Sequence, residues 1–118
     1  MIELSEVWTP TQGDFDAFAR VSGDDNAIHV DPDFCAQTTF GRTVSHGMLI
    51  YSKLWGMVRR YDPSLRQVSQ QMMFPNPAFT GEELLLEITE HRPNILTMRV
   101  TRSADGAECL TGEAEVTC

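Results

Sequence analysis

The chain has 118 residues, of which 42% are hydrophobic and 22% charged, and both values are typical of one globular domain spanning residues 1–118. The formal net charge of −8 argues against a nucleic-acid-binding protein, which normally carries a basic stripe. An anionic substrate would need a local cluster of Arg or Lys to offset the field of the whole chain.

Cysteine usage and the N-terminus indicate the compartment. Cys35, Cys109 and Cys118 are widely spaced, with no Cys-x-x-Cys pair and no Cys/His spacing typical of a metal site. Free thiols in a reducing cytosol are the simplest interpretation. The first residues are acidic where a signal peptide is basic and apolar, and no apolar stretch approaches the ~20 residues that span a bilayer. We expect a soluble cytoplasmic protein without a metal or a membrane contact.

Three short elements are predicted in the first third of the chain. Residues 2–7 alternate weakly between apolar and polar and predict a strand. Apolar residues within 15–22 recur at helical spacing, and Gly23 follows as a C-terminal cap. The Asp-Pro pair at 31–32 is typical of an N-cap and a first helical residue, and this helix is expected to reach Thr39.

The segment from Gly47 to Tyr61 is apolar on nearly every side. Its periodicity predicts a helix, in which Met48, Tyr51 and Trp55 fall on one stripe. A helix without a polar face must be buried on most sides, and 15 residues are too few to cross a membrane. Another part of the chain must therefore wrap it.

The second half of the chain supplies four apolar–polar alternations typical of strands, at 68–74, 84–88, 96–100 and 110–116. Short turn signals separate them, which predicts an antiparallel sheet. A long apolar helix followed by such strands indicates an α+β fold with the helix on the sheet. A strongly curved sheet around one long helix is the hot-dog arrangement, which the pattern alone leaves as one option among several.

The polar loop at residues 23–31, Gly-Asp-Asp-Asn-Ala-Ile-His-Val-Asp, is the first candidate site. A carboxylate and an imidazole at Asp24 and His29, with the amide of Asn26, could position and deprotonate a water. The alternative is a structural turn, because Asp and Asn favour turns by bonding to their own backbone. Asp31 is explained as a helix cap. The spacing leaves both interpretations of the loop open.

A second candidate precedes the long helix, where His46 and Gly47 close the segment Gly-Arg-Thr-Val-Ser-His-Gly-Met. Free N–H groups at a helix start attract negative charge, and glycine lets a ligand approach the backbone. Gly47 is therefore a candidate oxyanion site for a developing enolate; the alternative is an ordinary glycine-containing helix start, which the local pattern alone favours. His46 could donate to a ligand, or be a buried histidine bonded to backbone.

Together these two segments resemble the (R)-specific enoyl-CoA hydratases, the MaoC-like group of hot-dog proteins. That family carries Asp-x-Asn-Pro-x-His followed by Asp-Pro, on which Asp24, Asn26 and His29 fall. Its second mark, Arg-x-Val-x-His-Gly-Met, opens the central helix and matches residues 42–48. The stretch from residue 74 to 82 also resembles the family's entry into its later strands.

The resemblance implies a hot-dog homodimer that adds water to a trans-2-enoyl thioester, giving the (R)-3-hydroxyacyl thioester, or catalyses the reverse dehydration. Asp24 and His29 would hold the water, and the Gly47 N–H would stabilise the thioester oxygen. Asn26 and His46 would contact the substrate. A CoA or acyl-carrier-protein thioester is the expected substrate, and no cofactor or metal is expected.

Two alternatives and one departure accompany this prediction. A hot-dog thioesterase often has a carboxylate on or beside the central helix, but residues 47–61 contain none. A non-catalytic acyl-binding subunit has no need of the Asp/His pair.

The family usually has Pro where this chain has Ala27, so the loop is less restricted. Tyr51 and Trp55, four residues apart, either border the acyl tunnel or pack under the sheet.

Overall fold

The computed structural model describes residues 1–118 as one antiparallel sheet with four helices. The elements in chain order are β1 (Glu3–Trp8), α1 (Gln12–Ser22), α2 (Ala27–Val30), α3 (Pro32–Ala36), α4 (Gly47–Tyr61), β2 (Arg66–Met73), β3 (Leu84–Arg92), β4 (Ile95–Arg102) and β5 (Glu108–Thr117). No helix combines the length and the apolar character needed to cross a membrane.

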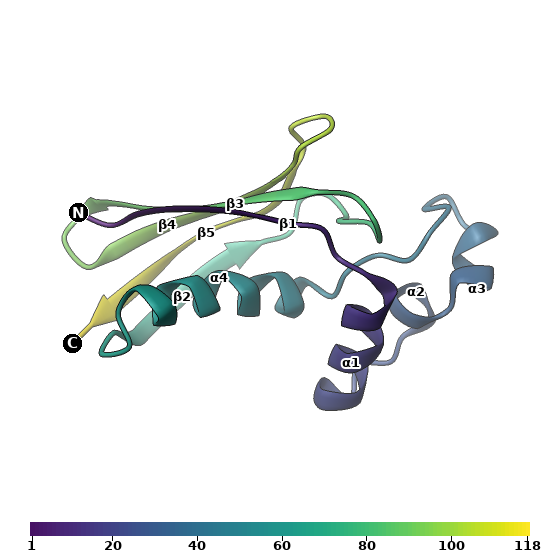
Figure 1. Cartoon of the computed structure of the whole chain (residues 1–118), viewed down its shortest axis with the longest axis horizontal. Helices are drawn as coiled ribbons and strands as arrows, with labels where there is room; N and C mark the ends of the chain where they lie inside the picture. Colours follow the sequence, from purple (N-terminus) through teal and green to yellow (C-terminus); the bar gives the residue numbers. More distant parts are fainter.

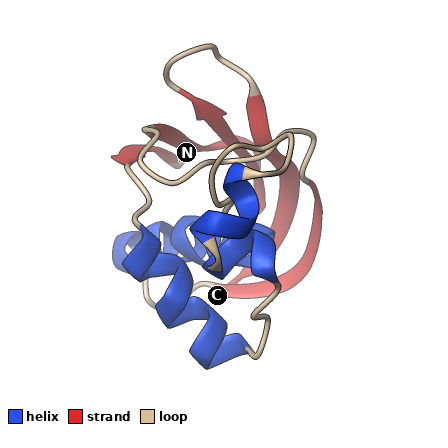
Figure 2. Ribbon diagram, turned by 90° about the vertical axis from the view of Figure 1, so that its right-hand side faces the viewer, coloured by secondary structure: helices blue, strands red, loops and turns tan.

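The sheet has the order β1-β3-β4-β5-β2, with every neighbouring pair antiparallel. The three consecutive strands β3, β4 and β5 form its middle, because short turns return the chain directly to the neighbouring strand. The strands β1 and β2, which flank the helical segment in sequence, become the two edges. Figure 1 shows α4 lying along one face of this sheet, and Figure 2 shows the sheet curving around it.

The hydrophobic core lies between α4 and the concave face of the sheet. One stripe of α4 is buried, including Ile50, Leu54 and Val58, because residues three and four apart share a helix face. Alternate strand residues such as Leu86 and Met98 supply the opposite wall. This arrangement confirms the predicted α+β hot-dog fold.

The helix starts and stops predicted from local signals are mostly confirmed. Gly23 has φ 81° and donates its N–H to the Ala19 carbonyl, which ends α1. Asp31 caps α3, as predicted. However, α3 ends at Ala36 rather than at Thr39, since the Thr38 hydroxyl and N–H both bond to the Cys35 carbonyl and replace a further helical turn.

The prediction of a strand at residues 68–74 differs from β2 at two residues. Phe74 was placed in the strand but lies beyond Met73, where the chain turns toward Pro75. Val68 was placed on the apolar face but is 55% exposed, because the register shifts between Gln67 and Ser69 and re-aims the side chains there.

The sheet covers α4 less completely than its composition predicts. Met48 is 49% and Tyr61 55% exposed, and Tyr51 and Trp55 are half-buried. The apolar stripe on the side of α4 away from the sheet thus remains open in the single chain. The short helices α1, α2 and α3 gather beyond the N-terminal end of α4 (Figure 1), and so frame that end and leave the stripe exposed.

Candidate active site

Asp24 occupies the turn between α1 and α2. The left-handed conformation of Gly23 reverses the chain there, and the Asp24 N–H donates to the Ser22 hydroxyl over 3.1 Å. Its carboxylate is 56% exposed and lines the largest cavity of the chain. The turn therefore fixes the backbone and leaves the carboxylate free to act on a ligand.

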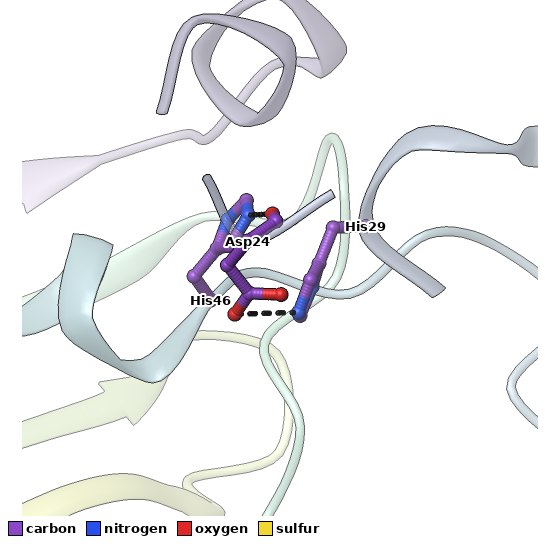
Figure 3. Close-up of side chains that lie close together, drawn as sticks. All are labelled: Asp24, His29 and His46. Atoms are coloured by element: carbon purple, nitrogen blue, oxygen red, sulfur yellow. Dashed lines mark hydrogen bonds and ion pairs between the residues drawn. The ribbon is translucent and has the colours of Figure 1, made fainter. Parts of the chain in front are cut away.

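His29 lies on the one-turn helix α2, which the sequence analysis treated as part of a loop. His29 is buried, with its side chain 9% exposed, and Nδ1 lies 2.7 Å from the Val44 carbonyl oxygen. A carbonyl oxygen only accepts, so Nδ1 must carry the proton and donate. In the neutral imidazole, Nε2 is then an acceptor, and it points to the Asp24 carboxylate (Figure 3).

The His29 Nε2 and Asp24 Oδ2 atoms are 3.8 Å apart, which is too far for a hydrogen bond. An ionised carboxylate and an unprotonated Nε2 are both acceptors, so they have no proton to share. One water between them could donate a hydrogen to each atom and keep its oxygen lone pairs free. The geometry is therefore suited to holding a nucleophilic water.

His46 anchors both members of this pair. Its Nε2 donates to the Asp24 backbone carbonyl over 2.9 Å, and its ring stacks on the His29 ring with centroids 3.9 Å apart. Phe18 packs against it, with the ring centroids 4.8 Å apart. The ring is 2% exposed, and its Nδ1 has no hydrogen-bond partner. Burial lowers the pKa of His46 below its ordinary value, and the nearby His29 adds to this effect, so the neutral form is favoured.

The N-terminus of α4 differs from the other helix starts. Thr11 forms a capping box on α1, Asn26 caps α2 and Asp31 caps α3. His46 makes no side-chain cap on α4, although Gly47 lines the cavity. The first N–H groups of α4 thus remain available to a ligand oxygen, as an oxyanion site requires.

The cavity at this end of α4 has a volume of about 410 Å³. Asp24, His46 and Gly47 form part of its wall, and Ile50, Phe74 and Cys109 contribute apolar surface. The aromatic ring of Phe74 lies over Gly47 so closely that a β-carbon at that residue would come within 2.7 Å of it. A glycine is required there for packing as well as for ligand access.

Three residues predicted to contact substrate do not line this cavity. The Asn26 side chain accepts from the Ile28 N–H over 3.1 Å and is used as a cap. Tyr51 and Trp55 pack against the hydrophobic core cluster, which is the second of the two arrangements considered for them, packing under the sheet. His46 does line the cavity, but its donor nitrogen is already bonded to backbone, so the prediction of a buried structural histidine is the better one.

Sequence analysis missed the Val44 carbonyl and Phe74 as parts of the site. Val44 is only an apolar residue in the sequence, and its carbonyl selects the His29 tautomer through a contact between residues 15 positions apart. Phe74 precedes a proline, which disfavours helix but gives no indication of a partner. No local pattern identifies either role.

A metal ion fits this cluster poorly. Asp24, His29 and His46 each offer a ligand atom, and these atoms lie within 4.8 Å of one another. However, the two imidazole rings are stacked with an angle of 23° between their planes. The lone pairs lie in the ring planes, so they run side by side rather than converging on one ion. The arrangement is instead compatible with acid–base chemistry.

Comparison with known proteins agrees with this geometry. The family model described as "MaoC like domain" matches residues 3–107. The chain is 37% identical over 108 residues to the (R)-specific enoyl-CoA hydratase of Aeromonas caviae, covering 85% of this chain and 80% of that protein. It is 35% identical over 82 residues to the mitochondrial 3-hydroxyacyl-[acyl-carrier-protein] dehydratase of Arabidopsis thaliana, covering 70% of this chain and 49% of that protein.

A solved structure, the (R)-hydratase from A. caviae involved in PHA biosynthesis, superposes with a TM-score of 0.88 at 32% identity. The superposition covers 98% of this chain and 93% of that one. The match therefore includes the sheet, the central helix, the turn that carries Asp24 and the short helix that carries His29. The chain belongs to the MaoC-like domain family.

Proposed function

We propose that this protein is a hydro-lyase that adds water to trans-2-enoyl thioesters to give (R)-3-hydroxyacyl thioesters, or catalyses the reverse dehydration. The names of its relatives support this class of reaction. The observation that carries the proposal is the 3.8 Å separation of Asp24 Oδ2 and His29 Nε2 beside the cavity. Two acceptors at that distance form a site for one water.

In the hydration direction, the water oxygen forms a bond to C3 of the enoyl group while Asp24 or His29 accepts one of its protons. The π electrons of the C2=C3 bond move toward the thioester carbonyl. The Asp24–His29 pair then delivers a proton to C2, so water is added without any net change in the pair. Both groups face the same water, so either can take its proton, and the pair acts as one acid–base unit.

The enolate oxygen that develops in this step needs a hydrogen-bond donor. The uncapped N-terminus of α4 supplies backbone N–H groups, with Gly47 first among them. Such donors are already oriented before reaction, so they stabilise the developing charge without reorganisation. We assign Gly47 this role, with His46 holding Asp24 in place rather than contacting the thioester.

The carrier is the part of the substrate that this site defines least. The acyl thioester would be presented either by CoA or by an acyl carrier protein, and the names of the two relatives above include both. The proposed reaction transfers no electrons and needs no cofactor beyond the thioester itself.

The test is an assay of the purified protein with crotonyl-CoA. Hydration removes the enoyl absorbance and yields 3-hydroxybutyryl-CoA that an (R)-specific dehydrogenase, but not an (S)-specific one, oxidises. Release of free CoA thiol would instead indicate a thioesterase, and tight binding without either change would indicate an acyl-binding subunit. The proposal is overturned if enoyl absorbance is lost neither from crotonyl-CoA nor from an enoyl-acyl-carrier protein, and one of those two results is seen instead.

The protein is further proposed to work as a homodimer in the cytoplasm. The strand β2 is a sheet edge, and Val68 and Met73 on it are 55% and 62% exposed. A second copy pairing along β2 would cover both features. A monomer observed by light scattering at micromolar concentration, with activity retained, would contradict the dimer.

The cytoplasmic location is supported by the free cysteines, which are consistent with a reducing compartment.

A further inference from the structure

We propose that Gln12 is a positioning residue for His29, acting through the His29 backbone, and that Gln12, Thr43 and Thr80 together form a clamp on the active site. The inference deepens the proposed function and rests on it. These three residues lie on α1, before α4 and after β2, and no local motif connects them. Hereafter they are called the Gln12 clamp.

Gln12 uses both ends of its side-chain amide. Its Nε2 donates to the His29 carbonyl over 2.8 Å and to the Asp16 carboxylate over 3.0 Å. Its Oε1 accepts from the Thr43 hydroxyl over 2.6 Å. An amide has two donor hydrogens and an acceptor oxygen, so every polar group of this side chain is engaged. The side chain is therefore held in one orientation.

Thr43 and Thr80 extend the clamp to the other wall of the site. Thr43 is 2% exposed, and the Thr80 hydroxyl donates to its backbone carbonyl over 2.9 Å. The Thr80 N–H bonds to the same carbonyl over 3.1 Å, and the two hydroxyls are in contact. This connection fixes the segment that carries Val44, the residue whose carbonyl selects the His29 tautomer.

His29 is thus restrained on two sides. Its ring is held by the Val44 carbonyl, and the Val44 N–H in turn donates to the Ile28 carbonyl over 2.9 Å. Its own carbonyl is held by Gln12 from α1. Because α2 has only four residues, it has little helical bonding of its own to fix the ring. The 3.8 Å gap to Asp24 therefore depends on these outside contacts.

Ala27 explains why this chain needs such a restraint. It is the first residue of α2, and no hydrogen bond from its N–H is present. A proline there would fix φ and narrow the conformations of the turn, whereas alanine leaves the turn free. Asn26 already has ψ 138°, the extended value that precedes proline. The geometry accepts Ala27→Pro, so that substitution can replace part of the restraint.

The experiment compares Gln12→Met, which keeps the length of the side chain and removes its hydrogen bonds, with the control Gln37→Met at an exposed residue whose side chain makes no hydrogen bond. We expect Gln12→Met to lower kcat for crotonyl-CoA about 10-fold to 10²-fold with KM within about 2-fold, since small misplacement of a catalytic group has effects of that order. Adding Ala27→Pro should recover part of kcat. The control should match the unmodified protein.

A second readout does not depend on turnover. The ¹⁵N NMR signals of the His29 ring report which nitrogen carries the proton and how each nitrogen is hydrogen-bonded, and we expect these signals to change in Gln12→Met. Unchanged His29 signals and unchanged kcat in the folded variant would overturn the inference. If the unmodified protein hydrates neither crotonyl-CoA nor an enoyl-acyl-carrier protein, the proposed function fails, while the NMR comparison still decides whether Gln12 positions His29.

If Gln12→Met does not fold, Thr43 provides the same test from the other end of the clamp. Thr43→Val removes the hydroxyl that bonds to Gln12, and Thr43→Ser retains it. We expect kcat and the His29 NMR signals to change in Thr43→Val and to be restored in Thr43→Ser. Equal values in the two variants would overturn the clamp.

Discussion

Residues 66–117 and residues 11–50 are stabilised by different interactions. In the first region, strands pair through continuous backbone ladders, and side chains such as Ile88 and Leu96 are completely buried. In the second, short helices are held by single side chains bonded to backbone groups, as at Gln12, His29 and His46. Removing apolar volume should therefore affect mainly stability, and removing one polar group near the site should affect mainly catalysis.

The largest effect is expected at the centre of the polar region. Asp24→Asn and His29→Ala should each lower kcat by about 10²–10⁴, because a positioned acid–base group contributes that much, while the circular dichroism spectrum stays that of a folded protein. Steady-state kinetics with crotonyl-CoA measures the loss. The control Asp25→Asn changes an exposed neighbour and should leave kcat unchanged. Near-normal turnover by either folded variant would rule out the assigned roles.

The opposite result is expected in the apolar region. Leu54 of α4 packs in the hydrophobic core against the strands of that region and is completely buried, so Leu54→Ala should lower the free energy of unfolding by about 2–5 kcal/mol. Urea denaturation measures this loss, and the kcat of the folded fraction should stay within about 2-fold. Val21→Ala, at a residue that is 85% exposed, is the matched control and should change stability by about 0.5 kcal/mol or less. A loss of kcat well beyond 2-fold in the folded fraction of Leu54→Ala would contradict the separation of the two regions.

His46 is expected to make the stability of the protein depend on pH. Burial lowers its pKa in the folded state below the ordinary histidine value of 6.5, so the unfolded chain binds a proton at His46 more readily. Stability contributed by neutral His46 should therefore be present above pH 6.5 and be lost as pH falls below it. Urea denaturation at pH 7.5 and 5.5 should show this loss in the unmodified protein and less of it in His46→Gln.

The three carboxyl groups with a lowered pKa do not account for a loss of stability just below pH 6.5. Hydrogen bonds lower the pKa of Asp62, Glu90 and Asp105 below the ordinary carboxyl values of 3.8 to 4.5. Their contribution is present above those values and is lost only at lower pH. An equal pH dependence in the unmodified protein and in His46→Gln would show that His46 is not the group responsible.

The smallest effect compares two glycines of α4. At Gly56 an added β-carbon would meet only the end of the Arg60 side chain at 3.6 Å, so Gly56→Ala should stabilise the protein by about 0.5–1 kcal/mol through helix propensity. At Gly47 the same change would press on the Phe74 ring at 2.7 Å. Gly47→Ala should therefore lower kcat/KM instead, and the double variant with Phe74→Leu should recover part of it. Thermal unfolding and kinetics measure the two outcomes.

Local patterns in the sequence determined most of the fold. The helix from Gly47 to Tyr61 has the predicted bounds, and Gly23 and Asp31 end and begin helices as predicted. The four later strands contain the predicted alternating residues, except Phe74, which lies beyond β2. Each of these signals depends on residues within a few positions of one another, so the chain carries it before folding. The one-turn helix α2 has too few residues to produce such a signal, which explains why it was missed.

Only the tertiary structure decided the geometry of the candidate site. Sequence motifs selected Asp24 and His29, but the 3.8 Å gap between their side chains depends on Val44, His46 and the Gln12 clamp. Gln12 and His29 are 17 positions apart, and Thr43 and Thr80 are 37 apart. Hydrogen bonds across such separations form only after the strands and α4 have brought the segments together, so no periodicity or spacing in the sequence encodes them.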